Sequence, residues 1–318
     1  MTKPGVILIT TLLILMVMSV ISMQVSKKFY VSLQREAYLD FKNQSYHMLI
    51  NSEKQVIRNL QKEAKVRQSK LTLSDSILKN KFYYQNDLMQ IEIDISDASN
   101  CFNLNSLFNK SSNTFKVRPA YRDWLIRFLE LKSLSTVNIQ SFIDQLVDWV
   151  DQDNQPLNFG AENYFYIGPA SQTQQFTPKR LLVDLSEIQN FPIMQTLDFN
   201  EITSGLCVIP GSTKQLLNIN TLISEDVLLV ASFFNETNLE FTESQIFNLP
   251  KNGYDDVSVF ARYFSQSANY PPQVLSINSQ TFSLEGIIIN ENFSASIKSL
   301  VILDPSNTVK IASRTFNF

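Results

Sequence analysis

The chain has 318 residues, of which 44% are apolar and 18% are charged, and its formal net charge at pH 7 is −3. This length is enough for one large or two modest folded units. The mildly acidic total, without a cluster of lysine and arginine, argues against a nucleic-acid partner, because phosphate binding depends on clustered positive charge.

A short leader and a long apolar stretch form the N-terminus. Residues 6–25 are a run of twenty without a charge, and at about 1.5 Å per residue such a helix spans roughly 30 Å, the thickness of a bilayer's hydrocarbon core. A cleaved secretory signal fits poorly, because its apolar region should have roughly 7 to 15 residues and end in an A-x-A-like site. The sequence therefore predicts a retained membrane anchor over residues 6–26.

The dipeptide Gly5-Val6, at the start of the apolar stretch, resembles a type IV prepilin peptidase site. Cleavage there removes a leader of residues 1–5 and keeps the apolar helix on the mature protein. Positive residues lie on both sides of the stretch, so the positive-inside count does not fix its orientation. The orientation therefore depends on the resemblance to pilins.

The helix is expected to continue beyond the membrane. Between Val6 and Arg118 there is neither glycine nor proline, so a continuous helix is permitted. Small and apolar residues recur there every three or four positions, which predicts a stripe that packs on a sheet. The stripe consists of Leu33, Ala37, Phe41, Ser45, Leu49, Ser52, Val56, Leu60 and Ala64.

Strand patterns occur at both ends of the part beyond the membrane. Residues 89–95 alternate between apolar and polar side chains, the period of a half-buried strand. Residues 274–289 and 295–303 are rich in β-branched and apolar side chains, and a turn at 304–307 leads into 309–311. These segments predict one antiparallel sheet.

The middle of the chain, residues 101–265, has a different pattern. Helical spacing recurs there between most of the prolines and glycines. The expected helices cover residues 121–132, 139–150, 182–190 and 225–234. The fold class is therefore α+β, with an all-α domain inserted between residues 27–100 and 266–318 of a helix-plus-sheet domain.

Two short segments of this middle region repeat a pattern. Residues 102–107 and 217–222 both read apolar-Asn-apolar-Asn-hydroxyl-Leu, and short amide side chains of this kind bond nearby backbone and cap a following helix. The repeat predicts two related helical sub-units and no catalysis. Nucleic-acid-binding hairpins are disfavoured, because neither segment is followed by a glycine-rich turn.

Cys101 and Cys207 are the two cysteines of the chain. Beyond an inner membrane they lie in an oxidising compartment, where a long-range bridge is allowed. The sequence does not give the distance between their Cα atoms. Two buried free thiols are expected in preference to a bridge.

Oxygen-bearing side chains follow the expected helix at 139–150. Positions one, three, five and twelve of the following loop are Asp151, Asp153, Gln155 and Glu162. This is the spacing with which an EF-hand gathers ligands around calcium, but Pro156 stands where that loop requires glycine. Asp148 lies one helical turn earlier and is a fifth candidate ligand. The alternative is a solvated acidic helix end followed by an irregular loop.

Six segments, in order along almost the whole chain, resemble the K-type minor pseudopilin of type II secretion systems. They are residues 5–10, Asp97 with residues 102–105, residues 148–153, residues 160–162, residues 217–221 and residues 275–282. The resemblance implies a pilin-like fold, a long N-terminal helix on an antiparallel sheet, with a large helical insertion. It also implies a structural calcium ion in the helical domain and no enzymatic activity.

The same resemblance implies a position at the tip of a periplasmic pseudopilus, where the protein starts or caps filament assembly for export of folded proteins. Its partners are then the I-type and J-type minor pseudopilins, the prepilin peptidase and the inner-membrane assembly platform. It crosses the inner membrane once, with its C-terminal domain in the periplasm.

The alternatives are a minor pilin of a type IV pilus, used in adhesion or DNA uptake, and a membrane-anchored periplasmic hydrolase. A hydrolase is disfavoured, because the chain has only one histidine and contains neither a G-x-S-x-G nucleophile elbow nor a P-loop motif.

The side chain of Thr10 fits the implied position at the tip of the filament. Thr10 is the fifth residue after the expected cut, where most pilin-like proteins have a glutamate that is thought to neutralise the amino terminus of a neighbouring subunit. A subunit with no neighbour ahead needs no such partner, and an unpaired charge in an apolar core is costly. Threonine can instead bond its own helix backbone.

Overall fold

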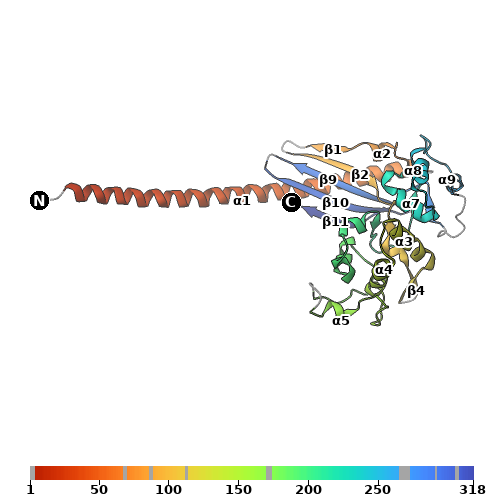
Figure 1. Ribbon diagram of the computed structural model, residues 1–318. Coiled ribbons are helices and arrows are strands. Elements are labelled where there is room, and N and C mark those ends of the chain that lie inside the picture. The colour runs from red at the N-terminus through yellow and green to blue at the C-terminus, as the bar shows by residue number, and fades with distance from the viewer. Residues whose placement is uncertain are drawn as a thin grey trace.

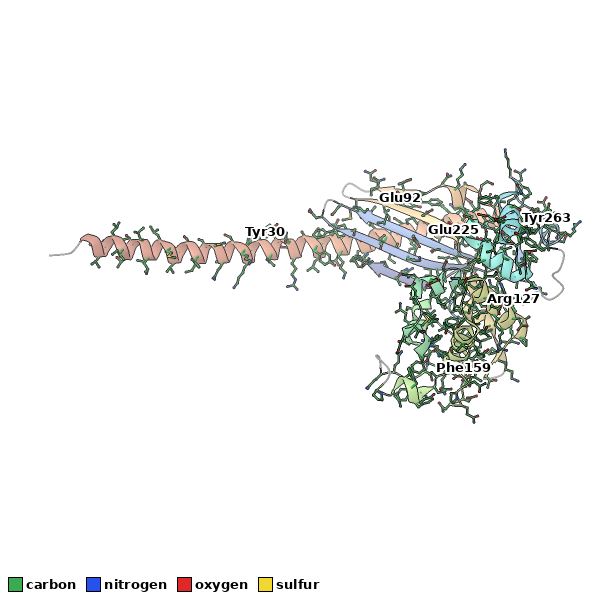
Figure 2. The ribbon with its side chains drawn as sticks, in the orientation of Figure 1. Tyr30, Glu92, Arg127, Phe159, Glu225 and Tyr263 are labelled. Carbon is green, nitrogen blue, oxygen red and sulfur yellow. A yellow bond between two sulfur atoms is a disulfide. The ribbon has the colours of Figure 1, made fainter. Side chains whose placement is uncertain are left out.

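A computed structural model describes residues 4–66, 70–85, 89–111, 114–169, 174–264, 273–290, 292–304 and 308–318. Its first helix, α1 (Pro4–Val66), projects far beyond the rest of the chain (Figure 1). The side chains of residues 5–37 are all exposed, and Tyr30 points outwards from this free part of the helix (Figure 2). The first part of α1 therefore contributes nothing to the core of the folded body.

The second half of α1 packs on the sheet as the stripe predicted. Phe41, Leu49, Val56 and Leu60 belong to a hydrophobic core with the strands, and Ser45 and Ser52 are also buried. The stripe begins later than expected, because Leu33 and Ala37 are exposed. The side chain of Ala64 lies outside the described residues.

The helix ends at Val66 although no glycine or proline follows it for many residues. Shortly afterwards the backbone N–H of Thr72 donates to the Asp75 carboxylate at 2.7 Å. Short polar side chains of this kind compete with helical backbone bonds. The turn leads into the short helix α2 (Ser76–Lys79).

Five antiparallel strands form the main sheet, in the order β1-β2-β9-β10-β11. Their bounds are Phe82–Gln85, Gln90–Asp97, Thr281–Ile289, Ser294–Leu303 and Val309–Asn317. The predicted alternation in β2 is confirmed, since Ile91, Ile93 and Ile95 are buried whereas Gln90 and Asp94 are exposed. The predicted turn at 304–307 lies mostly outside the described residues.

The first part of the expected strand at 274–289 has a different partner. β8 (Leu275–Ser276) pairs in parallel with β7 (Leu217–Asn218), not with the main sheet. The N–H of Leu217 donates to the carbonyl of Val274 at 2.8 Å. The prediction that this segment belongs to the antiparallel sheet is therefore wrong before β9, because a long-range backbone partner outcompetes the local pattern.

Between β2 and β9 the chain forms a body of short helices and short paired strands beside the far end of the sheet (Figure 1). Its longest helices, α3 (Pro119–Leu131) and α4 (Thr136–Val150), coincide with predicted ones. The predicted helix at 182–190 is a 3-10 helix, η2 (Leu185–Asn190), and the one at 225–234 is η4 (Ser224–Asp226) followed by α7 (Val227–Phe234).

The remaining elements of this body are short. They are β3 (Phe102–Asn103), η1 (Leu104–Leu107), β4 (Phe108–Ser111), β5 (Thr114–Val117), α5 (Asn163–Tyr166), η3 (Pro192–Gln195), α6 (Phe199–Thr203), β6 (Leu206–Cys207), α8 (Leu239–Phe247) and α9 (Val257–Ala261). Apolar residues from nearly all of them form one core around Trp124, Phe102 and Phe233, which is distinct from the core beneath the sheet.

The two repeated asparagine segments have equivalent roles in this body. In each, the first asparagine accepts a bond from the backbone N–H of the second, at 3.2 Å for Asn103 and 3.0 Å for Asn218. The second asparagine forms a two-bond pair with a distant backbone, Asn105 with Leu182 and Asn220 with Tyr254. Each segment also begins with a short parallel strand pair. The repeat is therefore structural.

Cys101 and Cys207 form a disulfide with a Cα–Cα distance of 5.8 Å. The expectation of two free thiols is wrong. The parallel pairing of β3 with β6 brings Cys101, just before β3, close to Cys207 in β6, although the two are 106 positions apart in the chain. Local sequence contains no signal for such a pairing.

Candidate metal centre

The loop that follows α4 carries the predicted ligands. α4 begins at a serine cap, in which Ser135 Oγ accepts from the N–H of Asn138 at 3.3 Å. It ends at Val150, and the extended backbone of the next residue, Asp151, stops the helix while the Asp151 N–H still donates to Val147 at 2.8 Å. Residues 151–162 then run along the surface to α5.

Three of the predicted ligands lie together. Carboxylate oxygens of Asp151, Asp153 and Glu162 all lie within 4.8 Å of one another. Glu162 is only 1% exposed, and neither of its oxygens has a hydrogen-bond partner. Asp151 Oδ1 is also buried without a partner. Buried carboxylate oxygens are normally paired or bound to a metal, because their desolvation is costly.

The pKa values of these acids reflect the same crowding. Burial, with the charges of Asp153 and Glu162, raises the pKa of Asp151 to about 6. Burial also raises the pKa of Glu162. Calcium binds carboxylate oxygens and compensates their charge, so the donor set fits that ion. Asp151, Asp153 and Glu162 are the residues that can hold it.

Asp148 and Gln155 do not belong to this group. Asp148 is fully buried beneath the loop and accepts from the N–H of Leu157 at 3.2 and 3.3 Å. Gly160 makes room for it, because a Cβ there would fall 1.9 Å from Asp148 Oδ2. Gln155 has an exposed side chain, and only its backbone N–H takes part, donating to Asp153 Oδ1 at 2.8 Å. Asp148 therefore shapes the loop from below.

A lysine far along the sequence also faces the loop. Lys179 Nζ lies 3.9 Å from Glu162 Oε2 and donates to Asn154 Oδ1 at 2.6 Å. Sequence reasoning missed it, because the local spacing around the acids says nothing about a residue seventeen positions after Glu162. It also missed Asp144, which accepts from the N–H of Phe159 at 3.2 Å. The i,i+4 spacing of Asp144 and Asp148 on α4 was the available signal for that residue.

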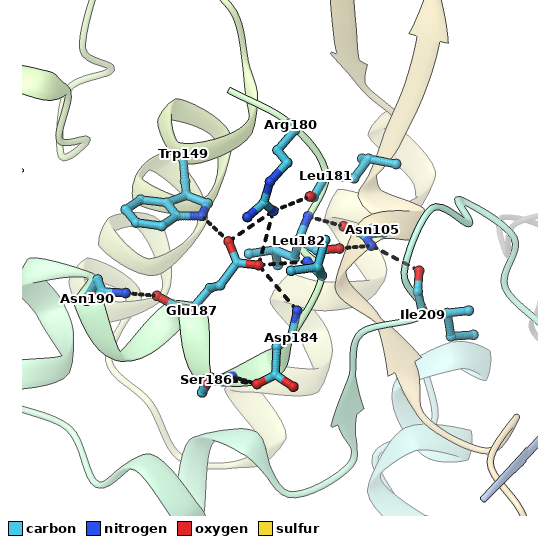
Figure 3. Close-up of polar contacts among 11 residues, drawn as sticks. Asn105, Trp149, Arg180, Leu181, Leu182, Asp184, Ser186, Glu187, Asn190 and Ile209 are labelled. Atoms are coloured by element: carbon cyan, nitrogen blue, oxygen red, sulfur yellow. Dashed lines mark hydrogen bonds and ion pairs between the residues drawn. The ribbon is translucent and has the colours of Figure 1, made fainter. Parts of the chain in front are cut away.

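A polar cluster fixes the segment that carries Lys179 (Figure 3). Glu187 accepts from the indole of Trp149 at 3.0 Å, from Arg180 at 3.1 Å and from the backbone N–H of Val183 at 2.7 Å. In the same view Asn105 pairs with the backbone of Leu182. The segment after residue 179 is therefore attached both to α4 and to the core.

At the other end of the molecule, α1 is the one helix in the described residues that is long and apolar enough to cross a membrane. Gly5 and Val6 lie at its exposed start. Thr10 Oγ1 donates to the carbonyl of Ile7 at 2.9 Å, the backbone bond expected for a threonine in an apolar helix. Processing after Gly5 and a role of Thr10 in positioning remain predictions.

The known proteins that this chain resembles all point to the same component of one secretion system. A family model described as type II secretion system (T2SS), protein K, matches residues 100–211. The type II secretion system protein K of Klebsiella pneumoniae is 30% identical over 145 residues, 46% of this chain and 44% of that protein. The protein K of Aeromonas hydrophila is 25% identical over 263 residues, 79% of this chain and 77% of that protein. Residues 100–211 therefore match the protein K family of type II secretion systems, and both relatives carry the same name.

A solved structure agrees with this family in fold. One chain of the crystal structure of the GspK-GspI-GspJ complex, from the type 2 secretion system of enterotoxigenic Escherichia coli, superposes with a TM-score of 0.71 at 19% identity. The match covers 87% of this chain and 98% of that chain. The predicted fold, a long N-terminal helix on an antiparallel sheet with many additional helices, is therefore confirmed.

Proposed function

We propose that this protein is the tip subunit of a type II secretion pseudopilus, where it starts or caps a filament that exports folded proteins across the outer membrane. Its role there is structural, without catalysis. The observation that carries the proposal is the agreement in fold along 87% of the chain with a chain of the GspK-GspI-GspJ complex. The I-type and J-type minor pseudopilins are accordingly its proposed partners.

The free part of α1 supports membrane insertion followed by polymer assembly. The proposed prepilin peptidase cut after Gly5 leaves an exposed apolar helix that lipid first covers and neighbouring helices then cover. The inner-membrane assembly platform moves it between these two surroundings. The disulfide between Cys101 and Cys207 supports a periplasmic location of the folded body, because such bonds persist in oxidising compartments.

The shape of the molecule supports the tip position. The helical body lies beside the end of the sheet that is far from the N-terminus (Figure 1). In a filament built from parallel α1 helices, that end faces the next subunit, so a large body there is accommodated most easily when no subunit follows. Thr10 supports the same position, since its hydroxyl bonds its own helix and offers no charge to a further subunit.

A structural calcium ion is the second part of the proposal. Asp151, Asp153 and Glu162 would hold it, and its chemistry would be to neutralise this group of carboxylates, in which Glu162 and Asp151 Oδ1 are buried without a hydrogen-bond partner. Asp148 and Asp144 hold the loop backbone from below through Leu157 and Phe159. The expected effect is a more stable loop on the surface of the helical body.

Copurification tests the main proposal. The full-length chain, expressed with candidate I-type and J-type subunits and extracted in mild detergent, is expected to retain both partners through affinity capture and size-exclusion chromatography. Mass spectrometry of the captured chain is expected to find Val6 as its first residue. Failure to retain either partner contradicts the tip assignment, and a first residue beyond position 20 contradicts the retained anchor.

A further inference from the structure

The ammonium group of Lys179 lies where the metal loop presents its oxygens. It donates to the carbonyl of Gln152 at 3.4 Å, to Asn154 Oδ1 at 2.6 Å and, in closer contact, to the carbonyl of Asp153. Glu162 Oε2 lies 3.9 Å away. A cation site consists of several oxygens around one positive charge, and here the ammonium group of a lysine side chain supplies that charge.

The protein holds this lysine in place at a conformational cost. Lys179 has a φ of +50°, a left-handed conformation that costs a non-glycine residue energy and persists only when its surroundings enforce it. Asn163 Nδ2 donates to Asn154 Oδ1 at 3.2 Å, and Asn163 Oδ1 accepts from the N–H and the hydroxyl of Thr177, both at 2.8 Å. The loop and the segment of Lys179 therefore share one hydrogen-bond network, with the amine directed into it.

Charge explains why a lysine at this position affects ion binding. Asp151, Asp153 and Glu162 with Lys179 leave a net charge of −2 when all are ionised, which one divalent ion neutralises. The same ammonium group repels that ion over a few ångströms. In the side-chain interactions found among the described residues, Lys179 is the cation that acts on both Asp151 and Glu162.

We propose that Lys179 is a tethered cation that competes with the metal ion of this loop, so that it holds the loop when no ion is bound and lowers the affinity when one binds. This inference rests on the proposed calcium site. It assigns to Lys179 a role that the spacing of the acids did not indicate.

Calorimetric titration of calcium chloride into the full-length chain in detergent tests the competition. Lys179→Met is expected to bind calcium at least about tenfold more tightly than the wild type, the effect of removing one positive charge a few ångströms from a divalent ion even at the dielectric constant of water. Lys179→Arg keeps the charge and is expected to stay near the wild type. Lys251→Met, an exposed lysine after α8, is the control for net charge and is expected to bind unchanged. Equal or weaker binding by Lys179→Met overturns the proposal.

Thermal unfolding in EDTA tests the other half of the proposal without any metal. Lys179→Met is expected to unfold at a lower temperature than the wild type and Lys251→Met, and saturating calcium is expected to close the difference. An unchanged midpoint in EDTA overturns the holding role. If calcium binds none of the four proteins, the metal site and the competition fail together, while the EDTA comparison separately decides whether Lys179 holds the loop.

Discussion

The carboxylate of Glu53, in α1, accepts two hydrogen bonds from the guanidinium group of Arg314, in β11, at 2.5 and 3.1 Å. Glu53 is only 1% exposed, and the hydroxyl of Ser299 also donates to it. Elsewhere along the same helix, Lys42 lies over the ring of Phe318, which follows β11. One buried charge pair thus attaches the last strand to the helix that carries the membrane anchor.

Arg314→Met is expected to lower the free energy of unfolding by about 3 kcal/mol, because it leaves the buried charge of Glu53 without a partner. Urea denaturation measures the change. Lys298→Met is the matched control, since Lys298 and Glu285 pair on the same sheet with side chains 68% and 57% exposed, and exposed pairs contribute less than about 1 kcal/mol. A double variant Glu53→Leu with Arg314→Met is expected to recover part of the loss, and equal losses in the single variant and the control would argue against a buried pair.

Replacing both Cys101 and Cys207 by serine is expected to lower the free energy of unfolding by about 3 kcal/mol, because the bridge restricts a long loop in the unfolded chain. Reductant is expected to have the same effect on the wild type and none on the variant. The measurement is urea denaturation with and without reductant. If reductant leaves the wild type unchanged, the disulfide does not contribute in solution.

Calcium at about one hundred times its dissociation constant is expected to stabilise the protein by about 2.7 kcal/mol over EDTA, because it binds the folded state alone. Asp153→Ala and Glu162→Gln are expected to lose this response. In EDTA, Glu162→Gln is expected to be at least as stable as the wild type, since it removes a buried charge whose oxygens accept no hydrogen bond. Glu243→Ala, an exposed acid on α8, is the control and keeps the response. A wild type that unfolds alike in calcium and EDTA contradicts the site.

The pH dependence is expected to differ between EDTA and calcium. Burial raises the pKa of Asp148 to about 7 and that of Asp151 to about 6, from 3.8. A raised pKa means that the folded state holds protons more tightly than the unfolded chain, so in EDTA stability is expected to fall as the pH rises from about 4 to about 7. Calcium binds the ionised carboxylates, so its stabilising effect is expected to grow over the same interval.

Thermal midpoints measured from pH 4 to pH 7.5 in both conditions test this prediction. Asp226, whose pKa burial raises to about 7 far from the loop, contributes equally with and without calcium and therefore cancels in the difference. A calcium effect that stays constant or shrinks with rising pH would show that the ion does not bind these acids.

Thr10→Val is expected to leave membrane insertion and copurification with the partners unchanged, because the hydroxyl bonds only its own helix. Thr10→Glu and Thr11→Glu place the same charge at nearly the same depth, at a cost of up to about 3 kcal/mol each, and are expected to reduce the recovered complex equally. The yield of I-type and J-type subunits captured with each variant is the measurement. Better assembly by Thr10→Glu than by Thr11→Glu would contradict a subunit with no neighbour ahead.

The predicted elements that the structure confirms are those with a strong periodic pattern of apolar residues. The stripe from Phe41 to Leu60 and the alternation in β2 follow from which side chains one helix face or one strand face presents. The acids at 151, 153 and 162 were also found by local spacing, because a loop of twelve residues brings its own ends together.

Interactions between segments far apart in the sequence could not be predicted from local patterns. The disulfide, the parallel pairing of β8 with β7, the ion pair of Glu53 with Arg314 and the approach of Lys179 to the loop each join segments that no local pattern relates. Asp148 lies in the predicted loop region, yet its role changed from ligand to buried support, because the packing beneath Gly160 decides which way its oxygens point.

By itself the sequence determined a membrane-length helix, its continuation as a sheet-packing stripe, and an acidic loop after a helix, since hydrophobic period and ligand spacing are local properties. Only the tertiary structure decided which of those acids converge, which cation faces them, and that the two cysteines are bonded. The physical reason is that packing of the two hydrophobic cores brings together side chains that are distant in sequence. Ion pairs and disulfides form only over the short distances that this packing creates.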